Sequence, residues 1–133
     1  MARGTGTLRR SGRGVAILVV EDNPTVRATA VEMFRRMGAE VFDTYNGRDA
    51  LAILEAHPEI ALLFADVRMP GMTGTELAEA AKRLRPSLRI VLTSGYLGEA
   101  PVPGLPFVPK PWREEAIAEL MRQAQPGPGR RTH

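Results

Sequence analysis

The sequence of 133 residues contains no cysteine and no long hydrophobic run. Without cysteine the chain can form neither disulfides nor thiolate metal sites, which agrees with a reducing compartment. The longest apolar stretches, residues 15–20 and 60–65, have the length of a strand and are too short to cross a bilayer. No apolar segment follows the basic N-terminus as it would in a secretory signal. We therefore expect a cytoplasmic protein without membrane insertion.

The excess of positive charge comes from the two ends of the chain. The sequence has 18 basic and 15 acidic residues, and neither residues 1–14 nor residues 124–133 contain an acid. These two segments carry Arg3, Arg9, Arg10, Arg13, Arg130 and Arg131. Because such Gly- and Pro-rich basic segments rarely fold, we predict two disordered tails around one domain at 15–123. The net charge of +3 is therefore no argument for direct nucleic-acid binding.

Between the tails, strand-like and helix-like segments alternate. The continuous apolar run at 15–20 is typical of a central parallel strand. Further strands are expected at 41–44, 60–65, 89–93 and 105–108. Helical spacing of apolar residues predicts helices that begin near Pro24, Gly47, Thr75 and Arg113. This alternation predicts an α/β fold with a doubly wound, five-stranded parallel sheet and right-handed crossovers.

The segment before the last strand departs from this alternation. It contains Pro101, Pro103, Pro106 and Pro109, where a fourth crossover helix would be expected. Proline lacks the amide donor of a helix and disfavours helical backbone in the residue before it. We therefore predict that the fourth helix is shortened or missing, and that this segment is irregular and mobile.

Polar side chains stand at the carboxyl ends of the predicted strands. Glu21 and Asp22 follow the first strand, Asp66 follows the third, Thr93 ends the fourth and Lys110 follows the fifth. In an open parallel sheet these ends form the binding crevice. Like charges about 4 Å apart repel by roughly 4 kcal/mol at an effective dielectric near 20, and a divalent cation relieves that repulsion. The oxygen ligands favour Mg²⁺ over zinc, since the motifs lack histidine and cysteine.

The same crevice has the groups needed to hold a phosphoryl group. Lys110 would neutralise its charge, Thr93 would donate a hydrogen bond to one oxygen, and the small Ser94 would leave it accessible. Asp66 could itself accept the group and form an acyl phosphate. Each feature alone has an ordinary explanation as a helix cap, a turn or a strand end. Their occurrence together and in this order favours function.

In these motifs the chain resembles the receiver domains of two-component response regulators. The resemblance covers residues 15–123 and rests on Val-Val-Glu-Asp-Asn at 19–23, Asp-Val-Arg-Met-Pro-Gly-Met-Thr-Gly at 66–74, Val-Leu-Thr-Ser-Gly-Tyr at 91–96 and Pro-Lys-Pro at 109–111. It implies a flavodoxin-like (βα)5 fold. It also implies a regulatory phosphoacceptor, which catalyses only its own phosphorylation and dephosphorylation and switches conformation to control a downstream protein.

The resemblance assigns a role to each residue of the crevice. Asp66 is implied as the phosphoacceptor, with a sensor histidine kinase or a histidine phosphotransfer protein as the donor. Glu21, Asp22, Asp66 and the backbone carbonyl of Arg68 are implied as ligands of Mg²⁺. Thr93 is implied as both a phosphoryl-binding and a switch residue.

Lys110 is implied as the second phosphoryl-binding residue, in a cis Lys110–Pro111 peptide. Phe107 occupies the aromatic switch position, which is usually tyrosine or phenylalanine, and its ring lacks a hydroxyl. Tyr96 either supplies a hydroxyl in its place or is a packing aromatic. With the fourth helix shortened, the dimer of DNA-binding relatives is not expected. Arg68 either covers the phosphoryl group and tunes its hydrolysis or is a solvated surface arginine. Ser94 could also tune the hydrolysis, because its small side chain leaves the phosphoryl group accessible.

Other classes of protein fit the motifs less well. A haloacid-dehalogenase-type phosphatase needs an acid where Arg68 stands, and a flavin phosphate would be repelled by Glu21 and Asp22. A pseudo-receiver, folded but not phosphorylated and used as an interaction module, is the alternative that remains. The resemblance fits both a stand-alone regulator and the receiver of a hybrid histidine kinase.

Overall fold

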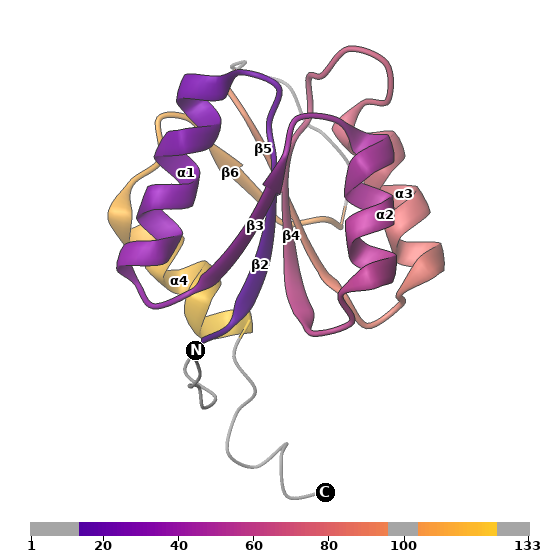
Figure 1. Ribbon diagram of the computed structural model, residues 1–133. Helices are drawn as coiled ribbons and strands as arrows, with labels where there is room; N and C mark the ends of the chain where they lie inside the picture. The colour runs from indigo at the N-terminus through magenta and orange to yellow at the C-terminus, as the bar shows by residue number, and fades with distance from the viewer. Residues whose placement is uncertain (1–13, 96–103, 125–133) are drawn as a thin grey trace, which may run out of the picture.

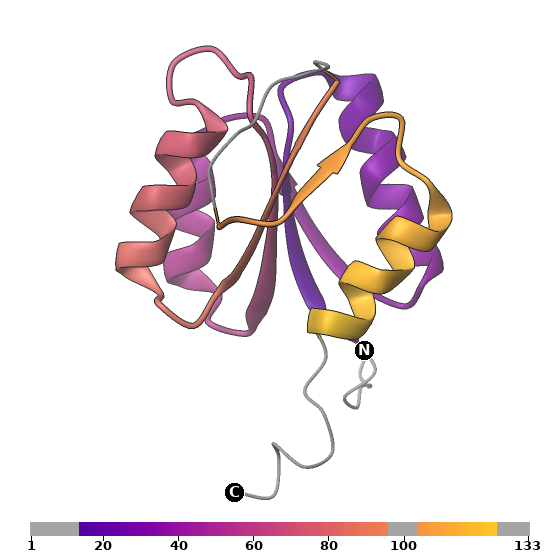
Figure 2. The same cartoon turned by 180° about the vertical axis from the view of Figure 1, so that it is seen from behind.

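A five-stranded parallel sheet forms the centre of the protein, and helices cover both of its faces (Figures 1 and 2). The computed structural model describes residues 14–95 and 104–124. Its strands are β2 (Ala16–Val20), β3 (Glu40–Thr44), β4 (Ile60–Asp66), β5 (Arg89–Ser94) and β6 (Phe107–Pro109). Its helices are α1 (Pro24–Arg36), α2 (Gly47–Ala56), α3 (Gly74–Leu84) and α4 (Glu114–Ala124).

The order of the strands in the sheet is β3-β2-β4-β5-β6, and all neighbours are parallel. This is the flavodoxin-like order, in which the chain moves outward from the first strand in both directions. The switch of direction lies between β2 and β4, and a ligand crevice is expected there, beyond the carboxyl ends of the strands. In Figure 1 these ends lie at the top of the sheet.

Each face of the sheet has its own apolar core. Helices α1 and α4 cover one face and helices α2 and α3 cover the other (Figure 1). On the α1/α4 face, the rings of Phe34 and Phe64 meet edge to face with centroids 5.2 Å apart. Strand β2 is buried along its whole length. A central strand covered on both faces explains the unbroken apolar run that the sequence has there.

Local side chains determine where the helices begin. Asn23 and Asn46 cap α1 and α2, each accepting a hydrogen bond from a backbone amide of the first turn. Thr73 and Glu76 form a reciprocal capping box at the start of α3. After α1, Gly38 takes a left-handed conformation with φ of 94°, which ends the helix.

The structure confirms the predicted α/β fold, with element bounds that differ from the expected ones by one or two residues. Helix α4, for example, runs to Ala124, where we expected the second tail to begin. The predicted shortened fourth helix falls mainly on residues 96–103, which lie outside the described residues. The predicted tails at 1–13 and 125–133 lie outside them too. Among the described residues, no helix is both long enough and apolar enough to span a membrane.

Candidate functional site

Three carboxylates meet at the carboxyl ends of β2 and β4, where the topology predicts a crevice. Glu21, Asp22 and Asp66 each place an oxygen within 4.8 Å of the other two. Glu21 and Asp66 are buried, with 3% and 5% of their surface exposed, whereas Asp22 is open to solvent. A cluster of carboxylate oxygens with one exposed side suits a hard cation such as Mg²⁺, which keeps several of its water ligands.

Lys110 lies between the two buried carboxylates. Its Nζ is 2.9 Å from Glu21 Oε1 and 2.9 Å from Asp66 Oδ2. Strand β6 places it there, since the amide of Lys110 donates to the carbonyl of Ser94 at the end of β5. The Lys110–Pro111 peptide is cis, as the resemblance implied. The lysine therefore neutralises part of the negative charge of the acidic cluster.

The electrostatics of the site follow from this arrangement. Burial raises the pKa of Glu21 to about 7, although the hydrogen bond from Lys110 opposes the shift and the neighbouring Asp66 adds to it. Burial alone would lower the pKa of Lys110, but its hydrogen bonds to the two carboxylates outweigh burial and raise that pKa. The site thus holds a firmly charged lysine beside a glutamate that takes up a proton near neutral pH.

The chain after Asp66 folds back over the end of its own strand. Asp66 Oδ1 accepts a hydrogen bond from the amide of Arg68 at 3.2 Å, and the amide of Gly74 donates to the carbonyl of Val67. A Cβ atom at Gly74 would lie 2.2 Å from the carbonyl oxygen of Asp66, so only glycine fits there. This return of the backbone holds the loop against the acidic cluster.

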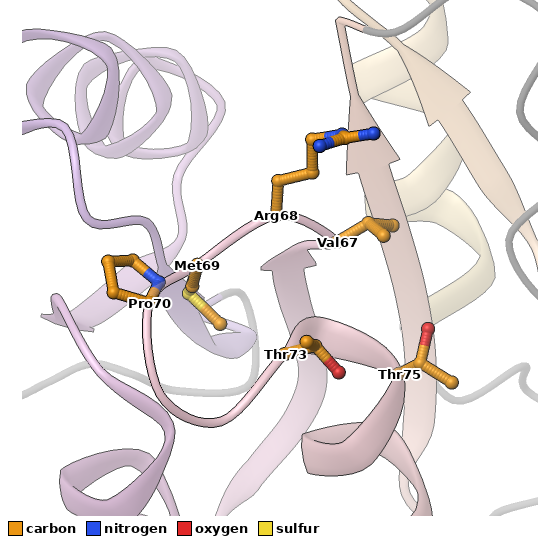
Figure 3. Close-up of a pocket in the computed structure, with 6 residues that line it drawn as sticks. All are labelled: Val67, Arg68, Met69, Pro70, Thr73 and Thr75. Atoms are coloured by element: carbon orange, nitrogen blue, oxygen red, sulfur yellow. The ribbon is translucent and has the colours of Figure 1, made fainter.

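An open hollow of about 540 Å³ lies along the loop that follows Asp66 (Figure 3). It is lined by Val67, Arg68, Met69, Pro70, Thr73 and Thr75. The side chain of Arg68 is exposed and extends away from Thr73 and Thr75 in Figure 3. The arginine therefore lines this hollow, and its predicted role in covering a phosphoryl group remains a prediction.

The hydroxyl of Thr93 already has a partner. Trp112 Nε1 donates a hydrogen bond of 2.7 Å to Thr93 Oγ1, and the indole packs edge to face on Phe64. Thr93 is in register with Asp66 on the neighbouring strand. Its predicted contact with a phosphoryl oxygen remains a prediction, and the structure gives its oxygen a different partner. Sequence reasoning missed this role of Trp112, which only the packing of β6 and α4 reveals.

Ser94 lies one residue farther toward the carboxyl edge of the sheet and is buried. Phe107 pairs with Leu92 on the adjacent strand and packs, half-buried, against the α2/α3 core. Its role as a switch remains a prediction. Tyr96, the other predicted switch residue, lies outside the described residues.

Comparisons with known proteins show the family to which the chain belongs. Residues 17–122 match the model of a family described as the response regulator receiver domain. The sensor kinase CckA of Brucella abortus is 30% identical over 114 residues, which are 80% of this chain and 12% of that protein. The sporulation initiation phosphotransferase F of Bacillus subtilis is 32% identical over 81 residues, which are 60% of this chain and 64% of that protein.

A solved structure shows the same likeness in three dimensions. The receiver domain of the hybrid histidine kinase CckA superposes with a TM-score of 0.70 and 35% identity, covering 82% of this chain and 97% of that one. The chain thus spans about an eighth of one of these curated relatives and just under two thirds of the other.

Proposed function

This chain belongs to the response regulator receiver domain family, and we propose that Asp66 accepts a phosphoryl group from a histidine kinase or a histidine phosphotransfer protein. The single observation that carries this proposal is the position of Asp66. Its carboxylate lies within 4.8 Å of two further carboxylates and 2.9 Å from Lys110. In this proposal the domain acts in the cytoplasm as a regulatory phosphoacceptor that controls a downstream protein.

The proposed reaction uses Asp66 as the nucleophile. A carboxylate oxygen of Asp66 forms a bond to phosphorus while the bond from phosphorus to the donor's imidazole nitrogen breaks, and the imidazole leaves. Glu21, Asp22, Asp66 and the carbonyl of Arg68 would hold Mg²⁺, which supplies positive charge next to the transferring group. Lys110 would turn from the carboxylates toward a phosphoryl oxygen, since it is already placed between them.

Mg²⁺ and Lys110 would each contact one oxygen of the phosphoryl group, and a hydroxyl is needed for the third oxygen. We assign this hydroxyl to Ser94 rather than Thr93. Thr93 Oγ1 accepts the hydrogen bond from Trp112, which holds its side chain on the α1/α4 face. Ser94 stands one residue nearer the edge beyond which the phosphoryl group would lie. Loss of the phosphorylated form in Ser94→Ala but not in Thr93→Val, measured by intact mass, supports this assignment, and the opposite pattern rejects it.

Arg68 is proposed to cover the phosphoryl group and to tune the rate at which it is hydrolysed. The support is its place two residues after Asp66, with an exposed side chain that lines the hollow along this loop (Figure 3). We expect Arg68→Ala to change the lifetime of the phosphorylated form. An unchanged rate of dephosphorylation would leave Arg68 as a solvated surface arginine.

The proposed function is tested by intact mass after incubation with acetyl phosphate and Mg²⁺. One phosphoryl adduct that needs both Mg²⁺ and Asp66 is expected, with Asp66→Asn and EDTA as controls. A second incubation with a phosphorylated histidine kinase tests the donor directly. If no adduct forms in a folded protein and Mg²⁺ leaves the fluorescence of Trp112 unchanged, the chain is a pseudo-receiver and acts by binding alone. If no adduct forms but Mg²⁺ quenches Trp112, the domain requires its own kinase.

A further inference from the structure

Arg27 of α1 reaches back to the end of β2 and holds the backbone of the acidic loop. Its Nη1 donates a hydrogen bond of 2.8 Å to the carbonyl oxygen of Glu21. Its Nε lies 3.2 Å from Asp43 Oδ2 at the end of β3, and its guanidinium lies 5.9 Å from the centre of the Tyr45 ring. One side chain therefore ties together α1, the loop after β2 and the end of β3.

The carbonyl that Arg27 holds belongs to the peptide between two carboxylate residues, Glu21 and Asp22. Because a peptide unit is planar, the direction of this carbonyl also sets the direction in which the chain enters Asp22. On its other side Glu21 is held as well, since its amide donates to the carbonyl of Thr44 at 3.1 Å. The backbone of Glu21 is thus held by a strand contact at its amide and by Arg27 at its carbonyl.

The geometry of the guanidinium suits this task. Its planar fork donates to the Glu21 carbonyl with one nitrogen and to Asp43 with another, so the second contact orients the first. The Arg27 side chain is only 21% exposed, which limits its freedom to leave this position. Lysine at this position has a single compact charge and cannot hold both acceptors at fixed angles.

From these contacts we propose that Arg27 is a positioning residue for a divalent cation at Glu21, Asp22 and Asp66. Among the described residues it forms no hydrogen bond or ion pair with the carboxylates that would bind the cation, and it acts by holding the peptide that joins two of these residues. This inference rests on the proposed Mg²⁺ site. It adds a residue of α1 to the groups on which Mg²⁺ binding depends.

The test measures Mg²⁺ binding directly, by calorimetric titration of the wild type, Arg27→Ala and Arg27→Lys. Changes to residues that orient metal ligands typically cost 10–100-fold in affinity, so we expect Arg27→Ala to bind Mg²⁺ about tenfold more weakly. Arg27→Lys should recover only part of that loss. Arg85→Ala is the matched control, because Arg85 also donates to backbone carbonyls near the opposite ends of the strands, those of His57, Pro58 and Ile60.

A second readout separates positioning from a general loss of structure. The rate of phosphorylation by acetyl phosphate should fall for Arg27→Ala at limiting Mg²⁺ and return to the wild-type plateau at saturating Mg²⁺. Urea unfolding shows whether each variant is folded. If Arg27→Ala is unfolded, the Mg²⁺ affinity of Arg27→Lys decides whether Arg27 has this positioning role.

The outcomes decide between the inference and the function on which it rests. Equal Mg²⁺ affinity of the wild type and Arg27→Ala would overturn the role of Arg27 and leave the proposed function standing. The role of Arg27 would also be overturned if Arg85→Ala lost as much Mg²⁺ affinity as Arg27→Ala, or if saturating Mg²⁺ did not restore the phosphorylation rate of Arg27→Ala. A wild-type protein that binds no Mg²⁺ would remove both the metal site and the inference.

Discussion

The indole of Trp112 donates a 2.7 Å hydrogen bond to the hydroxyl of Thr93 and thereby joins the loop after β6 to the end of β5. We expect Trp112→Phe to keep the packing on Phe64 but to lose this bond, at a cost of about 1 kcal/mol in the free energy of unfolding. Thr93→Val should cost at least as much, since it leaves the indole N–H without its partner. Urea unfolding of both single variants and the double variant measures the coupling. Additive losses would contradict a direct interaction.

Loss of Lys110 should leave two buried carboxylates without their counter-charge. Removing one partner of a buried ion pair is strongly destabilising, so we expect Lys110→Met to lose roughly 3 kcal/mol at pH 8 without Mg²⁺. The loss should shrink at pH 5.5, because Glu21, whose pKa burial raises to about 7, is then protonated. Urea unfolding at both pH values tests this. Lys82→Met, on the exposed face of α3, is the control and should change little.

Mg²⁺ binding should weaken as the pH falls. Glu21 must lose its proton to act as a ligand, and its pKa is raised by burial to about 7. Below that pH each bound cation displaces a proton, so we expect the affinity to fall by up to about tenfold for each pH unit. Calorimetric titrations at pH 6 and pH 8, each in two buffers of different ionisation enthalpy, measure affinity and proton release. Equal affinities at the two pH values would contradict the assignment of Glu21.

Two glycines of the loop after Asp66 should respond differently to alanine. At Gly74 a Cβ would lie 2.2 Å from a backbone oxygen, and we expect Gly74→Ala to cost about 3 kcal/mol or more and to disturb Asp66. At Gly71, where φ is 78°, no described heavy atom would lie within 4 Å of a Cβ. Gly71→Ala should cost only the 1–2 kcal/mol typical of left-handed backbone. Thermal unfolding compares the two variants, and equal losses would contradict the close approach at Gly74.

Much of the fold was predictable from the sequence because it depends on local patterns. The apolar run of β2 defines its own strand, and each capping residue, Asn23, Asn46 or Thr73, acts on the first turn of its own helix. The strand and the three helices accordingly lie close to the expected bounds. The convergence of Glu21 and Asp66 was also predictable, because neighbouring parallel strands bring their carboxyl ends to one edge.

The sequence alone therefore determined the order of strands and helices, the edge of the sheet that carries the chemistry and the acidic residues that meet there. Only the tertiary structure decided which side chains touch. Lys110 reaches Glu21 across 89 positions, Trp112 engages the hydroxyl of Thr93, and Arg27 turns back to the carbonyl of Glu21. Each of these long side chains has several polar groups within reach, and the packed positions of the helices and strands determine which of them it binds. The periodicity of the sequence does not encode these positions.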